Sequence, residues 1–188
     1  DMRTSSSKIG YVCQNPQNGI VTDKVWHELA FALENLGEPS VNIRKRVGEM
    51  ATYFGISGWY KKSVNSLSGG QKQILNLASS MVLNPEILLL DEPTSQLDPI
   101  AASDFLNMVK RINQELQTTV IITEHRTEEL LEFSTKTAVM EDGRLKAFDS
   151  PRNICKLIND SKFAMPAAVQ IFNKLSAESC PLTIKEAK

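Results

Sequence analysis

The sequence has little that would suit a membrane interior, a nucleic-acid surface or a disulfide framework. Its apolar runs, such as residues 87–90, fall far short of the roughly 20 residues that a membrane-spanning helix needs. Its 21 basic and 22 acidic residues give a net charge of −1, which offers no reason to expect a nucleic-acid partner. Cys13, Cys155 and Cys180 are scattered and form no CxxC pair, so reduced thiols are expected rather than a zinc site.

The composition is that of an ordinary globular protein, with 41% hydrophobic and 23% charged residues in a chain of 188. Short apolar runs alternate with segments of helical periodicity, which predicts an α/β fold with a largely parallel sheet. Strands are expected at residues 9–12, 87–90, 120–123, 137–140 and 145–148, with a loop at 14–19 after the first and an Asp142-Gly143 hairpin turn between the last two. The runs at 87–90 and 120–123 are apolar enough to predict strands that are buried on both faces. A helical block over about 23–67 interrupts the alternation like an inserted subdomain.

The segment Leu67-Ser68-Gly69-Gly70-Gln71 precedes a strongly amphipathic stretch. Ser68 can cap that helix, and Gln71, three residues later, can complete a capping box. The two glycines leave the backbone amides at the helix start uncovered, which makes an anion-binding site. The alternative interpretation is a plain capped turn between two helices.

The apolar run 87–90 leads directly into Asp91 and Glu92. The run therefore delivers two carboxylates to the carboxyl edge of the sheet, where open α/β folds bind ligands. Successive strand side chains point to opposite faces, so the two acids should have different roles. One can hold Mg²⁺ through water, and the other can polarise an attacking water. Alternatively, both are solvated acids at a strand end.

Two more polar residues follow predicted strands, namely Gln14 and His125, and Asp98 precedes Pro99 as a helix cap. Each is unremarkable alone. Together with the capped glycine pair and the paired acids, their order and spacing resemble the ATP-binding cassette (ABC) family over roughly residues 8–158. The matching motifs are the Q-loop at Gln14, the signature at 67–71, Walker B at 87–92, the D-loop at 95–98 and the switch histidine at His125.

A closer resemblance is to the energy-coupling-factor (ECF) ATPases, which power the import of vitamins and transition-metal ions. It rests on Gln14-Asn15-Pro16, on residues 20–31 and on Thr123-Glu124-His125-Arg126. Residues 165–183 resemble the linker between the two cassettes of a fused, tandem member. The resemblance therefore implies the first cassette of a tandem protein, with residues 1–158 as a partial nucleotide-binding domain, a helical subdomain at about 23–83, and a linker or tail at 159–188.

The resemblance implies a P-loop NTPase-like fold and a role for each motif. Two cassettes sandwich ATP and Mg²⁺, so a second cassette is an expected partner. The implied roles are phosphate binding by Ser68, Gly69, Gly70 and Gln71, Mg²⁺ binding by Asp91 and Gln14, general base catalysis by Glu92, a γ-phosphate contact by His125, and an interface contact by Asp98. The other implied partners are a transmembrane coupling subunit and a substrate-binding membrane subunit, with the protein peripheral on the cytoplasmic face of the membrane.

The chain departs from the family in one serious respect. A P-loop needs Gly-x-x-x-x-Gly-Lys-Ser/Thr to hold the phosphates, and no Gly-Lys dipeptide occurs in this sequence. The chain is therefore expected to be truncated or degenerate, and expected neither to bind ATP tightly nor to hydrolyse it alone.

Two other functions compete with a transport ATPase. A degenerate cassette could act as a non-catalytic docking or regulatory module, although such a module has no chemical need for both Glu92 and His125. A soluble ABC ATPase of DNA repair or translation is the other. Repair members insert long coiled coils between the Q-loop and the signature, whereas residues 15–66 here lack sustained heptads.

Overall fold

The computed structural model describes residues 8–125, 127–157, 166, 169–170, 181–182 and 186. They belong to two compact units, Asp1–Glu124 and His125–Lys188. The first unit contains a three-stranded parallel sheet with its helices, and the second contains an antiparallel strand pair. The predicted α/β class with a parallel sheet is confirmed.

The sheet of the first unit has the order β1 (Ile9–Val12), β2 (Ile87–Asp91) and β3 (Thr119–Thr123). Tyr11 lies opposite Leu89, and Leu89 opposite Ile121. Because all three strands are parallel, their carboxyl ends meet at one edge of the sheet. The residues that follow the strands are therefore brought together there from distant parts of the sequence.

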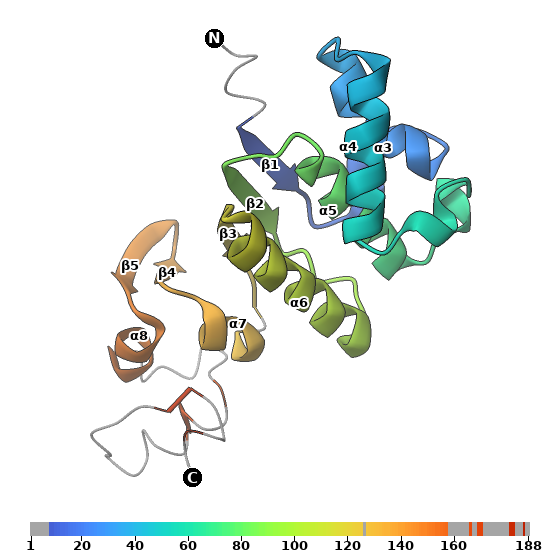
Figure 1. Ribbon diagram of the computed structural model, residues 1–188. Coiled ribbons are helices and arrows are strands. Elements are labelled where there is room, and N and C mark those ends of the chain that lie inside the picture. The colour runs from blue at the N-terminus through green and yellow to red at the C-terminus, as the bar shows by residue number, and fades with distance from the viewer. Residues whose placement is uncertain are drawn as a thin grey trace. The chain divides into compact units, whose positions relative to one another are not determined.

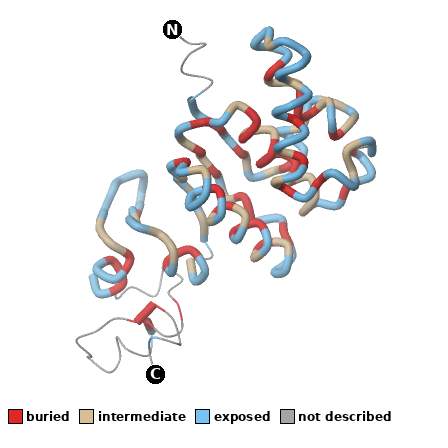
Figure 2. Tube along the Cα trace, in the orientation of Figure 1, coloured by how far each residue is buried: buried red, intermediate tan, exposed pale blue. Residues whose placement is uncertain are grey.

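Seven helical segments lie between these strands among the described residues of the first unit. Between β1 and β2 they are α2 (Pro16–Gly19), α3 (Val25–Asn35), α4 (Ser40–Tyr53), the 3₁₀ turns η1 (Ser57–Trp59) and η2 (Val64–Ser66), and α5 (Gly69–Met81). Helix α6 (Pro99–Leu116) lies between β2 and β3. Helix α5 contacts β1, α6, α3 and α4, so it joins the sheet to the helical block (Figure 1). Buried residues occur along α3, α5 and α6, where the tube is red (Figure 2).

Local capping chemistry sets the starts of α5 and α6 as predicted. The Ser68 hydroxyl accepts a hydrogen bond from the Gln71 amide, and the Gln71 side chain accepts one from the Ser68 amide. Asp98 Oδ1 accepts from the amides of Ile100 and Ala101. Such caps satisfy amides that have no partner inside the helix.

One segment expected as loop is helical. Residues Pro16–Gly19 form the short helix α2, because Asn15 Oδ1 accepts from the Gln17 amide at 3.0 Å and Pro16 stands at the first helical position. Proline there has a suitable φ and lacks an amide hydrogen that would need a partner.

The prediction that β2 and β3 are buried on both faces is wrong. Leu88 and Leu90 are buried, but on the opposite face Ile121 is 54% exposed and Tyr11 is 57% exposed. The reason is that α5 packs on the face that carries Gly10, where an added Cβ would come within 3.4 Å of the Ser80 carbonyl oxygen. The face that carries Tyr11, Leu89 and Ile121 is the more open one in the described part of the chain.

The second unit begins with α7 (Glu128–Phe133), continues through β4 (Thr137–Glu141) and β5 (Arg144–Asp149), and includes α8 (Pro151–Leu157), which the sequence analysis did not predict. Asp142 and Gly143 have φ values of 50° and 71° and connect the two strands, as predicted for an Asp-Gly hairpin. A small core joins α7 and α8 through Leu131, Cys155, Val169 and Leu182.

No helix within the described residues is both long and apolar enough to cross a membrane. The predicted linker or tail at 159–188 lies largely outside the described residues, as does Arg126.

Candidate functional site

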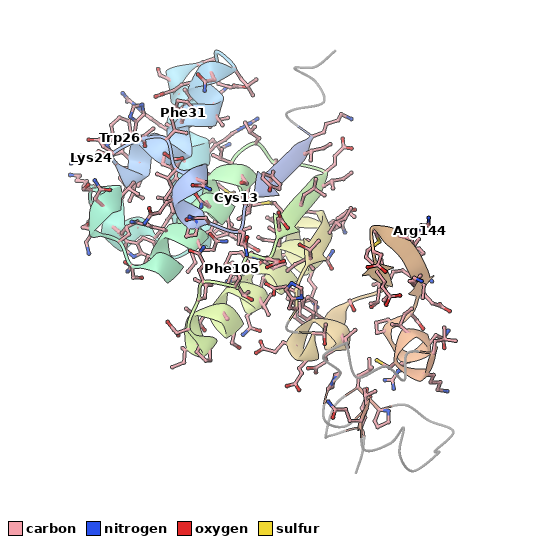
Figure 3. All side chains as sticks on the ribbon, turned by 180° about the vertical axis from the view of Figure 1, so that it is seen from behind. Cys13, Lys24, Trp26, Phe31, Phe105 and Arg144 are labelled. Atoms are coloured by element: carbon pink, nitrogen blue, oxygen red, sulfur yellow. The ribbon has the colours of Figure 1, made fainter. Side chains whose placement is uncertain are left out.

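The carboxyl edge of the sheet brings two predicted site residues into direct contact. Gln14 follows β1, and its Nε2 donates a hydrogen bond of 3.0 Å to Oε2 of Glu92, which follows β2. The two residues are 78 positions apart in the sequence. Figure 3 labels Cys13, the neighbour of Gln14, at the end of β1. The contact depends on the parallel pairing of β1 with β2, which places the ends of both strands side by side.

Glu92 has an unusual backbone conformation, with a φ of 41°. Its amide donates to the carbonyl oxygen and to the hydroxyl of Thr123, both at 3.1 Å. A non-glycine residue in the left-handed region carries a conformational cost of about 1–3 kcal/mol and persists where surrounding contacts impose it. Here β3 imposes the conformation, and the Glu92 carboxylate is held toward Gln14 as a result.

Both carboxylate oxygens of Asp91 have donors on neighbouring strands. Thr123 donates its hydroxyl to Oδ1 at 2.9 Å, and the Tyr11 hydroxyl lies 3.4 Å from Oδ2. Loss of hydration and then the negative charge of Asp91 raise the pKa of Tyr11, so its hydroxyl stays protonated and remains a donor. The Asp91 carboxylate is thus held in one orientation at the exposed strand end.

A further carboxylate at this edge was missed by the sequence analysis. Glu124 follows β3, and its Oε1 accepts from both the amide of Thr94, at 2.9 Å, and the hydroxyl of Thr94, at 2.7 Å. Thr94 is 1% exposed and begins the loop that leads to Asp98. The contact therefore fixes the start of the D-loop against the end of β3. Its position in the sequence, after a predicted strand and next to His125, could have indicated that Glu124 lies at this edge.

The predicted signature residues lie at the start of α5 and adjoin the start of α6. A Cβ added at Gly69 would meet nothing within 4 Å, whereas one at Gly70 would lie 3.1 Å from the Ala101 Cβ. Ala101 belongs to the first turn that Asp98 caps. Ser68 and Gly69 are exposed, so the first amides of α5 are open to an anion.

His125 is the first residue of the second unit and is exposed. It follows Glu124 directly in the chain. The structure thus brings Gln14, Asp91 and Glu92 together at one edge, places Ser68–Gln71 and Asp98 at two adjoining helix starts in the same unit, and puts His125 in the other unit.

The comparisons with known proteins agree with this arrangement. The sequence profile of the ABC transporter family matches residues 1–95. A putative ABC transporter ATP-binding protein of Bacillus thuringiensis is 44% identical over 187 residues, covering 98% of this chain and 34% of that protein. The energy-coupling factor transporter ATP-binding protein EcfA1 of Symbiobacterium thermophilum is 38% identical over 178 residues, covering 93% of this chain and 62% of that protein.

A solved structure is also similar. CbiO1 from Clostridium perfringens, described as part of the ABC transporter complex CbiONQ, is 32% identical with a TM-score of 0.73, covering 79% of this chain and 59% of that one. By comparison with its sequence relatives, the chain spans about a third of the length of the Bacillus thuringiensis protein. The matched residues 1–95 include the predicted Q-loop, signature and Walker B, whose geometry is described above. The chain belongs to the ABC transporter family, as an ATP-binding domain.

Proposed function

We propose that this chain is part of an ATP-hydrolysing subunit that energises the import of a vitamin or a transition-metal ion across the cytoplasmic membrane. The observation that carries the proposal is the Gln14–Glu92 contact of 3.0 Å, formed with Glu92 in a left-handed backbone conformation. A carboxylate fixed in this way suits a general base, because its oxygen is positioned before substrate binds. The likeness to EcfA1 and CbiO1 supports the class of transported substrate.

In this proposal Glu92 takes the proton of the attacking water on a carboxylate oxygen while Gln14 orients that carboxylate. Ser68, Gly69, Gly70 and Gln71 bind the γ-phosphate of ATP held by a second cassette, and the amides of Gly69 and Gly70 are not used by the capping box. Asp98, which caps α6 beside Gly70, contributes to the interface between cassettes. His125 contacts a γ-phosphate of ATP.

The residues at the sheet edge fit a magnesium ion. Asp91 and Gln14 offer oxygen ligands, which Mg²⁺ prefers. No group of three or more His, Cys, Asp or Glu side chains gathers as a metal site in the described part of the chain. Mg²⁺ suits such a site because it keeps several waters and binds through one or two carboxylates plus phosphate oxygens. When bound, the ion would neutralise phosphate charge. Tyr11 and Thr123 would keep the Asp91 carboxylate oriented.

We further propose that the transmembrane coupling subunit docks on the helical block, with the substrate-binding membrane subunit joined through it. Helices α3 and α4 and residues 60–61 enclose a groove of about 480 Å³ lined by Trp26, Ile43, Val47 and Tyr60 among others. Trp26 is 41% exposed and lies on the outer side of the block (Figure 3). An apolar groove with polar edges is suited to an inserted helix. This docking makes the protein peripheral on the cytoplasmic face.

The chain is proposed to be the first cassette of a tandem protein, with residues 1–158 as the cassette, 23–83 as its helical subdomain and 159–188 as a linker. The one-third share of the Bacillus relative's length supports this proposal. ATP hydrolysis then depends on a P-loop in the full-length protein. In a phosphate-release assay, we expect the full-length protein to hydrolyse ATP with Mg²⁺ but not with EDTA. The 188-residue chain should release no phosphate under either condition. A full-length protein that binds membrane subunits without hydrolysing ATP would instead be a degenerate docking module.

The open start of α5 gives a prediction for Gly69→Ala. The added methyl group meets no atom within 4 Å in the fold, so the domain should remain folded. It would, however, stand beside the amides proposed to bind phosphate. Loss of one good phosphate contact, worth about 1.4 kcal/mol, should lower kcat/KM for ATP about tenfold in the full-length protein.

Gly48→Ala is the matched control, since its added methyl group is equally free and lies within α4. It should leave hydrolysis unchanged and stabilise the helix by roughly 0.5–1 kcal/mol. Equal activity in the two variants would argue against phosphate binding at the start of α5.

A further inference from the structure

Helix α5 carries a row of polar side chains on the face that meets the sheet. Gln73, Asn76 and Ser80 recur at spacings of three and four residues, so they share one face of the helix. Gln73 is 0% exposed and Asn76 is 4% exposed, although both are amides. Buried amides are unfavourable unless they are hydrogen-bonded. We refer to these three residues as the polar row of α5.

The polar row holds the backbone on both sides of Gln14. Ser80 Oγ donates to the Tyr11 carbonyl at 2.9 Å, and Gln73 Nε2 lies 3.4 Å from the Cys13 carbonyl. Asn76 Nδ2 donates to the Pro16 carbonyl at 2.8 Å. The chain after Gln14 also approaches α5 closely. A Cβ added at Gly19 would lie 3.1 Å from the Asn76 amide.

Gln73 also reaches the segment that follows Glu92. The same Nε2 atom donates to the carbonyl of buried Pro93 at 3.0 Å. One side-chain nitrogen therefore bridges two chain segments, one ending at Cys13 and one beginning at Pro93. These segments border Gln14 and Glu92, whose side chains meet at 3.0 Å. Gln73 therefore contacts the residue before Gln14 and the residue after Glu92.

We infer that the polar row of α5 positions the Gln14–Glu92 pair for hydrolysis, with Gln73 as the main positioning residue. The inference rests on the proposed function. Its physical basis is that the N-terminus of the same helix carries Ser68 and Gly69, while its polar row grips the segments that carry the glutamine and the general base. A hydrogen-bonded helix moves as a unit, so the row sets the distance between the phosphate-binding start of α5 and the segments that border Gln14 and Glu92.

A purely structural role for the polar row predicts a different outcome. Buried hydrogen bonds stabilise any fold, and removing them lowers stability wherever they lie. A positioning role predicts that kcat falls while KM for ATP is kept, because the nucleotide is held by other residues. The two roles are separated by comparison with a buried hydrogen bond of the same kind that lies away from the site.

The test uses the full-length protein with Gln73→Met and Ser80→Ala. Methionine keeps the length of the side chain but cannot donate to Cys13 and Pro93. We expect kcat to fall about 10- to 100-fold in Gln73→Met, since small misplacements at a distance can have effects of this size. Ser80→Ala, which removes one hydroxyl from a half-buried position, should lower kcat by less. KM for ATP should stay within about twofold of the wild type in both variants.

Thr118→Val is the matched control. Thr118 is 2% exposed, and its hydroxyl lies 3.4 Å from the Pro85 carbonyl at the amino end of the sheet, opposite the site. It should lower the melting temperature without lowering kcat. If the control loses kcat as Gln73→Met does, or if both row variants hydrolyse ATP at the wild-type rate, the inference is overturned and the proposed function stands. Should Gln73→Met fail to fold, Ser80→Ala decides between the same outcomes. A wild-type protein without hydrolysis would overturn the proposed function itself.

Discussion

Glu92→Gln should lower kcat for magnesium-dependent ATP hydrolysis by the full-length protein about 100- to 10,000-fold, the range expected for loss of a positioned general base. The amide has the shape of the carboxylate but cannot take a proton from water. Its carbonyl oxygen can still accept the hydrogen bond from Gln14, and the backbone bonds to Thr123 do not involve the side chain. The fold and the ATP affinity should therefore be kept, and the loss should appear in kcat.

Glu86→Gln is the matched control for this experiment. Glu86 precedes β2 as Glu92 follows it, and its carboxylate pairs with Lys8 at 2.9 Å on the surface. The same chemical change at the opposite end of the same strand should leave kcat unaltered, because exposed ion pairs contribute at most about 1 kcal/mol. If Glu92→Gln hydrolyses ATP as fast as Glu86→Gln, then Glu92 is not the general base. The docking-module alternative gains support if neither variant nor the wild type turns over ATP.

The features that sequence analysis predicted well depend on local chemistry. The capping box of Ser68 and Gln71, the Asp98 cap and the Asp-Gly hairpin each involve residues within three positions of one another. Such contacts are encoded in a few neighbouring side chains, so pattern and spacing suffice to predict them. The order of strands followed by polar residues also predicted the sheet edge at which Gln14 and Glu92 meet.

The features that were missed depend on pairs far apart in the sequence. Gln73 and Cys13 are 60 positions apart, and Thr94 and Glu124 are 30 apart. No local pattern distinguishes a buried glutamine that holds two carbonyls from one that faces solvent. The prediction that β3 is buried on both faces was wrong for a related reason. An apolar strand sequence permits burial of both faces, but whether a helix covers each face depends on residues far away in the sequence.

A buried acid outside the sheet edge provides the second large effect. Glu28 lies in α3, is 4% exposed, and its Oε2 accepts from the Val21 amide, the Thr22 amide and the Thr22 hydroxyl at 3.1, 2.7 and 2.9 Å. These bonds secure the segment between the Q-loop and the helical block. Glu28→Ala should lower the free energy of unfolding of the first unit by about 2–4 kcal/mol, since hydrogen bonds to a charged group contribute about 1.5–3 kcal/mol each and Val21 remains open to water.

Urea unfolding of the 188-residue chain, followed by tryptophan fluorescence, measures this loss, because Trp26 and Trp59 both belong to the first unit. Glu34→Ala is the control on the same helix. Glu34 is exposed, and its Oε2 lies 3.3 Å from Nε2 of His27. Removal of this carboxylate should therefore lower the free energy of unfolding by less than about 1 kcal/mol. Glu28→Gln, which keeps a carbonyl acceptor, should fall between the two. Equal losses for Glu28→Ala and Glu34→Ala would mean that water replaces the carboxylate at the amides, and that the segment after the Q-loop is held by α5 instead, through the Asn76 bond to Pro16.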